Sequence, residues 1–262
     1  MSEKLALTLL WITLCGAAAF GGTFTREFSN TYNFDGFRVS IKTVNGSVYV
    51  ESWDDERVSV YAEIQVRSGS LEAARRFAEK IKIIVQQQQD ELLVEADQPA
   101  FGNAGFMDWL FGGGRVNVSV DFEIKVPRGM NVTAASVNGS LDVVGVSGEV
   151  KVSTTNGRIS VEEMIGPLEA TTTNGSIRVD LAEIDDDEAV SLRTVNGSIT
   201  LMLESDIGAD VRVSTVNGKI TTDFPLEIRG EWGPKRISGK IGGGGAQIRM
   251  ETVNGNITIE ER

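Results

Sequence analysis

A six-residue motif that recurs seven times constrains the fold of this chain more than any other feature of its sequence. The copies are TVNGSV (43–48), SVNGSL (136–141), TTNGRI (154–159), TTNGSI (172–177), TVNGSI (194–199), TVNGKI (215–220) and TVNGNI (252–257). From Asn138 onward, successive motif asparagines lie 18, 18, 22, 21 and 37 residues apart. Similar segments at such spacing are typical of a repeat protein in which each copy is one structural unit.

The last interval is about two units long, and the segment ISGKIG (237–242) lies in its middle. There, Ser238-Gly239 stands where Asn-Gly would be expected. We therefore interpret this segment as a degenerate copy, which gives eight units in all.

Apolar and polar residues alternate on both sides of each Asn-Gly. In one unit, Val150 and Val152 precede Asn156, and Ile159 and Val161 follow it. Alternation with a period of two predicts strands with one buried face. Because Asn and Gly tolerate positive φ best, we expect the pairs to form sharp corners. These structural corners are Asn45-Gly46, Asn138-Gly139, Asn156-Gly157, Asn174-Gly175, Asn196-Gly197, Asn217-Gly218 and Asn254-Gly255.

Two architectures fit this pattern. Asn-Gly between alternating strands is also a strong signal for a β-hairpin, so a meander of hairpins competes with a β-solenoid. We favour the solenoid because stacked coils place each motif on its own copy, where columns of Asn and Thr side chains can form hydrogen bonds along the stack. The expected fold is therefore an all-β, β-helix-like single stack of about eight coils.

The repeats resemble a known family, the bacterial "putative adhesin" β-solenoid domain, which is exported and of unknown function. The resemblance rests on the TVNGSI copies, on KTVNGSVYVESWDDERVSVYAEI (42–64), on KVPRGMNVTAASVNGSLDV (125–143) and on ISGKIGGGGAQIRMETVNGNITI (237–259). It covers the chain from about Phe34 onward. It implies a coiled β fold and export, and it brings no catalytic or binding residues with it.

Between the first two copies, the pattern is less regular. Residues 58–66, 81–87, 92–96 and 116–126 read as strands, and LEAARRFAEK (71–80) reads as one short helix capped by Ser70. We expect this helix to cover apolar surface where the stack would otherwise expose an edge; docking of a partner is the alternative. The predicted organisation is a signal peptide (1–19), an N-terminal coil with its additions (20–128) and the repeat solenoid (129–262), the latter two in one continuous domain.

The N-terminus resembles an export signal. An apolar run from Leu5 to Leu14 is too short to span a bilayer, and Ala17-x-Ala19 suits cleavage after Ala19. Cys15 is the single cysteine; because Leu14 precedes it, we do not expect a lipid anchor there. We therefore expect an exported protein of the periplasm, cell envelope or cell surface.

Composition excludes several classes of function. Acidic residues outnumber basic ones by 37 to 25, a net charge of −12, which disfavours nucleic acid as a partner. Histidine is absent, which removes His-based triads and His metal ligands. No cofactor or catalytic residue is predicted.

Acidic runs are the weak candidates for metal binding. Asp185, Asp186, Asp187 and Glu188 fall in the 22-residue unit and predict a protruding corner. They lack the alternating ligands and the central glycine of a calcium loop, so a solvated acidic turn is the preferred interpretation. The same holds for Asp54-Asp55-Glu56.

One stretch, PAFGNAGFMDWLFGGGR (99–115), breaks the alternation. We expect its large apolar side chains to plug an open coil end; the alternative is a contact surface for a membrane or a protein. These side chains are Phe101, Phe106, Met107, Trp109, Leu110 and Phe111.

Taken together, these features predict a non-catalytic envelope or surface scaffold that binds an unknown partner through an extended face. The alternative is a carbohydrate-active enzyme on the same fold. Glycoside hydrolysis requires two carboxyl groups at a defined separation in a cleft, whereas the acids here are scattered or at corners. Acids that converge in one groove would favour the enzyme.

Overall fold

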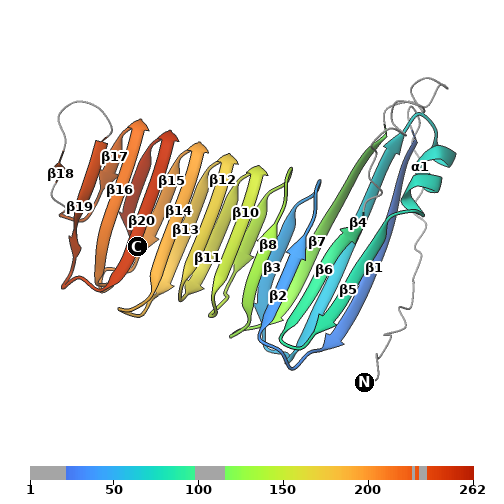
Figure 1. Ribbon diagram of the computed structural model, residues 1–262, viewed down its shortest axis with the longest axis horizontal. Coiled ribbons are helices and arrows are strands. Elements are labelled where there is room, and N and C mark those ends of the chain that lie inside the picture. The colour runs from blue at the N-terminus through green and yellow to red at the C-terminus, as the bar shows by residue number, and fades with distance from the viewer. Residues whose placement is uncertain (1–21, 98–115, 226–227, 230–234) are drawn as a thin grey trace.

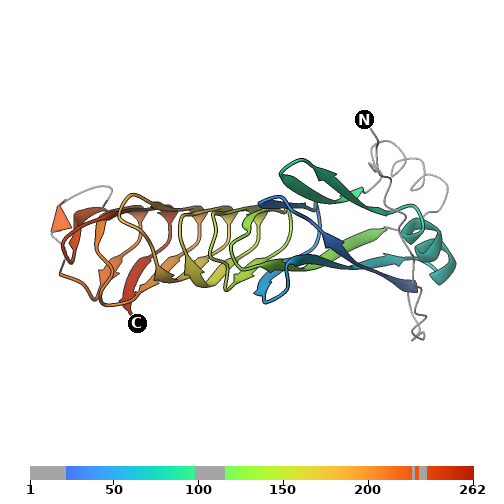
Figure 2. The ribbon, with the colours of Figure 1, turned by 90° about the horizontal axis from the view of Figure 1, so that it is seen from below.

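The computed structural model describes residues 22–97, 116–225, 228–229 and 235–262, which form two large β-sheets and one helix (Figures 1 and 2). The predicted signal peptide, Cys15 and the apolar stretch 99–115 lie outside these residues. The expectation of an all-β chain with one short helix is confirmed.

Sheet A contains ten strands in the order β1-β4-β7-β3-β9-β11-β13-β15-β21-β17. Their bounds are β1 Gly22–Asn33, β4 Arg57–Ser68, β7 Asn117–Pro127, β3 Val48–Trp53, β9 Leu141–Val144, β11 Ile159–Ile165, β13 Ile177–Glu183, β15 Ile199–Leu203, β21 Ile257–Glu261 and β17 Ile220–Thr222.

Sheet B contains eleven strands in the order β18-β19-β16-β20-β14-β12-β10-β8-β2-β6-β5. Their bounds are β18 Ile228–Arg229, β19 Lys235–Ile241, β16 Ala209–Asn217, β20 Ala246–Asn254, β14 Ala189–Asn196, β12 Leu168–Asn174, β10 Val150–Asn156, β8 Asn131–Ala135, β2 Arg38–Lys42, β6 Glu91–Asp97 and β5 Lys82–Gln88.

Each Asn-Gly joins a strand of sheet B to a strand of sheet A. For example, β10 precedes Asn156-Gly157 and pairs in parallel with β8 and β12, while β11 follows and pairs in parallel with β9 and β13. In a hairpin, β10 and β11 would instead pair with each other. The repeats therefore form a solenoid-like stack rather than a meander.

The core of the stack consists of columns of apolar side chains in register. Val152, Ala170 and Leu192 are aligned across β10, β12 and β14 and are buried. This is the consequence of the period-two alternation, because every second side chain of each strand points between the sheets. Burial of these columns supplies the main driving force for stacking.

The last repeat does not stack in sequence order. The coil of β20 and β21 comes last in the sequence. In the stack, however, it lies between the coil of β14 and β15 and the coil of β16 and β17. The interpretation of ISGKIG (237–242) as a degenerate coil is wrong. Ser238 and Gly239 lie inside β19, which pairs antiparallel with β16 at the end of sheet B.

The N-terminal end of the molecule is built differently. There, β1, β4 and β7 pair antiparallel, as do β5 and β6, and Figure 2 shows the two sheets diverging toward this end. The four expected strands are confirmed as β4, β5, β6 and β7, whereas the sequence pattern does not predict β1. Helix α1 (Leu71–Ala78) contacts β1 and β4, and the Ser70 hydroxyl accepts a hydrogen bond from the Ala73 amide (3.2 Å).

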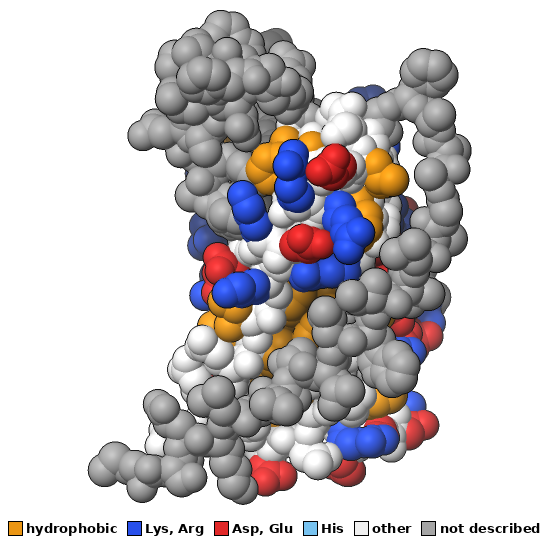
Figure 3. Space-filling view, turned by 90° about the vertical axis from the view of Figure 1, so that its right-hand side faces the viewer, with side chains coloured by type: hydrophobic (Ala, Val, Ile, Leu, Met, Phe, Trp, Pro, Cys, Tyr) orange, Lys and Arg blue, Asp and Glu red, His pale blue; other side chains and the backbone are white. Residues whose placement is uncertain are grey.

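The side of the molecule that carries β1 and α1 shows basic, acidic and apolar side chains intermixed (Figure 3). Among the residues that the structure describes, no helix has the length and apolarity required to cross a membrane.

Candidate binding surface at the Asn-Gly corners

The seven Asn-Gly corners form one straight edge of the stack, which we call the Asn-Gly edge. At each corner, alternation places one side chain inward and the next outward: Thr154 is buried, Thr155 and Asn156 are exposed, and Ile159 is buried again. The edge therefore presents three columns of side chains: the residue before each Asn, the Asn itself and the residue after each Gly.

The asparagines form a continuous hydrogen-bonded ladder. The Nδ2 of Asn156 donates to the Oδ1 of Asn138, and the Nδ2 of Asn174 donates to the Oδ1 of Asn156, both at 2.8 Å. All six links measure 2.7–2.8 Å, and the stacking order is Asn45, Asn138, Asn156, Asn174, Asn196, Asn254 and Asn217. The predicted Asn column is confirmed.

The buried Thr side chains bond differently from the expectation. The Thr172 hydroxyl donates to the carbonyl oxygen of Gly157 (3.0 Å), not to another Thr. The same Thr-to-Gly bond, at 2.9–3.1 Å, recurs for Thr154, Thr194, Thr215 and Thr252, and Ser136 makes it to Gly46. Because these hydroxyls are buried away from water, the bond also provides each hydroxyl with the hydrogen-bond partner that it needs.

Glycine is needed at the corners because of close packing rather than positive φ. Of the seven repeat glycines, only Gly46 has a positive φ (139°), so the expected left-handed corner is wrong for the other six. A Cβ atom at Gly157 would lie 2.0 Å from the carbonyl oxygen of Gly139, and one at Gly175 would lie 1.9 Å from that of Gly157. Only a residue without a side chain lets successive corners approach this closely.

The outermost column of the edge is apolar over most of its length. It contains Val44, Val137, Thr155, Thr173, Val195, Val253 and Val216 in stacking order. Of the nine large apolar side chains that are exposed among the described residues, five are valines of this column, each 39–47% exposed. Concentration in one row, rather than scatter, is typical of a contact surface.

The edge is also poor in charge, although 24% of the chain is charged. In its third column, Ser47, Ser140, Ser176, Ser198 and Asn256 are neutral, and Arg158 and Lys219 are basic. Each interior Asn uses one amide hydrogen and one oxygen lone pair in the ladder, so one of each remains available to a ligand. The edge can therefore offer regularly repeated methyl, hydroxyl and amide groups.

The opposite, return edge, where the chain passes from sheet A back to sheet B, contains the predicted acidic corner. A depression of about 490 Å³ there is lined by Glu149, Glu183, Asp185 and Glu188, among other residues. Lys151 and Arg38 lower the pKa of Glu149. The Glu188 carboxylate accepts a hydrogen bond from the Asp185 amide (3.2 Å), and no group of metal-ligating side chains suited to an ion occurs in the described part of the chain.

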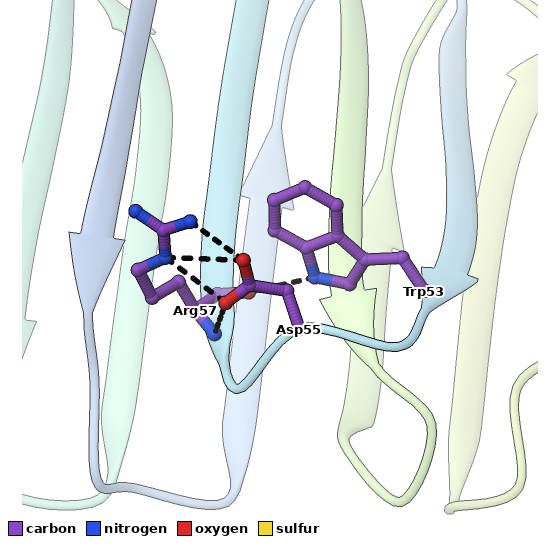
Figure 4. Close-up of polar contacts among 3 residues, drawn as sticks. All are labelled: Trp53, Asp55 and Arg57. Atoms are coloured by element: carbon purple, nitrogen blue, oxygen red, sulfur yellow. Dashed lines mark hydrogen bonds and ion pairs between the residues drawn. The ribbon is translucent and has the colours of Figure 1, made fainter.

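The acidic run after Trp53 forms an ordered turn between β3 and β4 (Figure 4). Arg57 donates to Asp55 through Nε (2.9 Å) and Nη2 (2.6 Å), which lowers the pKa of Asp55 to about 2. Trp53 Nε1 donates to the Arg57 carbonyl (2.8 Å), and Arg128 pairs with Asp54 (3.0 Å). These carboxylates hold the turn where the chain leaves the parallel stack.

The sequence profile of the Toastrack DUF4097 family matches residues 111–260, more than half of the chain. The protein therefore belongs to the Toastrack DUF4097 family, and the resemblance proposed from the repeats is confirmed. No curated protein matches the chain.

Two of the solved structures that align with most of this chain carry adhesion-related descriptions. A "putative cell adhesion protein" from Clostridium sporogenes superposes with a TM-score of 0.50 at 12% identity, covering 91% of this chain and all of that one. A "putative adhesin" from Bacteroides fragilis, also 12% identical, covers 89% of this chain and 97% of its own, with a TM-score of 0.37. The first likeness supports the fold assignment alone.

Proposed function

We propose that this protein is a non-catalytic scaffold of the bacterial envelope or surface that binds an extended ligand through the Asn-Gly edge. The observation that carries the proposal is the row of five exposed valines beside an unbroken, largely uncharged Asn ladder. Family membership and the adhesion-related description of a protein with the same fold agree with this proposal.

The edge favours a periodic ligand over a compact one. Parallel strands repeat every 4.8 Å or so, so equivalent methyl and amide groups recur at that interval along the edge. Each single contact is weak, and affinity accumulates over several corners. A polymer that runs along the edge meets this geometry better than a small molecule.

The binding experiment uses two matched triple variants. Val137→Asp, Thr173→Asp and Val253→Asp place three charges on alternate corners of the edge. Ser160→Asp, Thr200→Asp and Thr221→Asp place three on the outer face of sheet A, again on alternate strands. Co-sedimentation of labelled protein with purified sacculi and with outer-membrane vesicles measures binding.

We expect the edge variant to lose at least about tenfold in affinity, since one buried unpaired charge costs more than 1.4 kcal/mol. The sheet-face variant should bind like the wild type, and both should keep the wild-type melting temperature. Equal binding by the edge variant and the wild type would reject the edge as the contact surface.

Export is part of the proposal and has its own test. If residues 1–19 are a signal peptide, protein recovered from the envelope should begin near Phe20, and intact-mass measurement would show this. A species that retains Met1, or that carries a diacylglyceryl group on Cys15, would contradict it.

A second candidate function is a carbohydrate-active enzyme, which the four carboxylates of the return-edge depression favour. A general acid needs a raised pKa, whereas the pKa of Glu149 is lowered. Release of reducing sugar from a panel of polysaccharides, abolished in the Glu183→Gln and Glu188→Gln variants, would support this function over the scaffold.

A further inference from the structure

A cluster of basic residues lies on the outer face of sheet B, at the end where the last repeat is inserted. Arg193, Arg249, Arg212 and Arg236 project from the four neighbouring strands β14, β20, β16 and β19. The cluster contains one acidic side chain, Glu251. Four arginines against one glutamate make this patch strongly positive on a chain whose net charge is −12.

Glu251 neutralises only part of the cluster. Its carboxylate accepts hydrogen bonds from Arg249 Nε (2.8 Å) and Nη2 (2.5 Å) and forms an ion pair with Arg193 (3.3 Å). By contrast, the guanidinium groups of Arg212 and Arg236 form no ion pair or hydrogen bond with any residue that the structure describes. Both arginines are exposed and therefore available to a ligand.

The placement of these arginines is unfavourable without an anion. Arg212 lies directly opposite Arg249 in the β16–β20 register, and like charges directly opposite each other on neighbouring strands destabilise a sheet. Substitution of either by a neutral residue would remove this repulsion. A negatively charged ligand bound between the two guanidinium groups would attract both and offset their mutual repulsion.

The surface between the arginines is hollow. A depression of about 370 Å³ is lined by Arg212, Arg236, Arg249 and Glu251 together with the hydroxyls of Ser214 and Ser238. Each guanidinium offers a planar fork of N–H donors that matches the two oxygens of a carboxylate or phosphate. The serines add neutral donors to the same floor.

We infer that this depression, the arginine groove, binds a carboxylate- or phosphate-bearing group of an anionic ligand, with Arg212 and Arg236 as the primary donors. It lies on the face of sheet B and contains no residue of the Asn-Gly edge, so the inference does not depend on the proposed function. An acidic polysaccharide and a phosphate-containing envelope polymer share this chemistry.

Isothermal titration of the whole chain at low ionic strength provides the test. The probes are tripolyphosphate, an oligogalacturonate as the carboxylate source and maltohexaose as the neutral control. We expect saturable binding of at least one anionic probe, none of maltohexaose, and weakening as NaCl is raised through the range in which exposed charges are screened.

Matched variants separate a site from a general charge effect. Arg212→Gln with Arg236→Gln should weaken binding of the anionic probe at least tenfold. Arg67→Gln with Arg76→Gln removes the same charge from exposed positions at the N-terminal end of the molecule and should leave binding within about twofold. Glu251→Gln should tighten it, since it releases Arg193 and Arg249 for the ligand.

Two results would overturn the inference. One is equal weakening in the two double variants, which would mean that the probe responds to net charge alone. The other is the absence of binding of both anionic probes to the wild-type chain. A circular dichroism spectrum like that of the wild type in each variant shows that the variant is folded and that any loss of binding arises in the groove.

Discussion

The strands of the repeat stack and of the N-terminal end share the same alternation of apolar and polar residues. Neighbouring strands pair in parallel in the stack and antiparallel at the N-terminal end. In the stack, β10, β12 and β14 run parallel, and each is followed by an Asn-Gly that sends the chain to the other sheet. At the N-terminal end, β1, β4 and β7 run antiparallel, and their turns carry no Asn-Gly. Alternation therefore specifies that a segment is a strand, whereas corner chemistry specifies which strand it pairs with.

The largest expected effect concerns the stacking order of the last repeats, which disulfide crosslinking can test. In a Cys15→Ser background, we expect the pair Val195→Cys and Val253→Cys to crosslink nearly completely on mild oxidation, and likewise Val216→Cys with Val253→Cys. Each pair lies on neighbouring strands about 4.8 Å apart, within disulfide range. Gel mobility without reductant measures the yield.

The matched control is Val195→Cys with Val216→Cys. Stacking in sequence order would make these two residues neighbours, but the inserted repeat separates them by about 10 Å, so no disulfide should form. Thr155→Cys with Thr173→Cys, on neighbouring strands of regular repeats, is the positive control. A crosslink between positions 195 and 216 in folded protein would contradict the inserted order.

A single methyl group at a corner should show how strongly the stack depends on close approach. Gly175→Ala places a Cβ 1.9 Å from the Gly157 carbonyl oxygen and forces neighbouring corners apart. We expect a loss of about 2–3 kcal/mol in the free energy of unfolding, with a fall in melting temperature of about 5–10 °C. Thermal and chemical denaturation both measure this loss.

The corresponding change at the N-terminal end is Gly69→Ala. No atom lies within 4 Å of the position that its Cβ would occupy, so stability should change by less than about 0.5 kcal/mol. Similar losses in the two variants would mean that corner packing does not distinguish the two regions.

The Asn ladder should contribute less than the glycines because it is exposed. Asn174→Ala removes a hydrogen bond to Asn156 and one from Asn196 and should cost about 1 kcal/mol. Asn217→Ala, at the end of the ladder, removes one bond and should cost about half as much. Equal losses at the two positions would indicate that the ladder bonds are not the cause.

The smallest effect concerns the turn where the two regions meet. Because the pKa of Asp55 is lowered to about 2 in the folded chain, this carboxylate stabilises the fold at neutral pH, and its contribution disappears as pH falls from about 4 to 2. Arg57→Gln should move the Asp55 pKa back toward its ordinary value of 3.8, as NMR titration would show. An unchanged Asp55 pKa in this variant would show that Arg57 is not responsible.

The sequence predicts the repeat architecture well because its signals are local. Alternation identifies the strands, and Asn-Gly at fixed positions identifies the corners, including the Asn column. It misplaces ISGKIG (237–242), which resembles the repeat motif but is not a corner. Instead, β19 folds back and pairs antiparallel with β16, and this pairing is not encoded in the motif. It also misses β1, because Arg26 and Asn30 interrupt the apolar face that carries Phe24, Phe28 and Tyr32.

The arginine groove escapes sequence analysis for a similar reason. Arg193, Arg212, Arg236 and Arg249 are separated by 13 to 24 residues in the chain. They lie near one another because β20 is inserted between β14 and β16 and because β19 pairs antiparallel with β16. No motif connects them. The same holds for the valine column, whose members look like ordinary variable positions until the corners are stacked.

The inserted C-terminal repeat has a consequence for synthesis. A ribosome delivers residues 209–222 before residues 246–261, yet β16 and β17 contact the rest of the stack through β20 and β21. The final unit therefore cannot assemble vectorially, one coil after another, as the earlier ones can. A chain that stops before residue 246 lacks β20 and β21, the strands that join the coil of β16 and β17 to the rest of the stack.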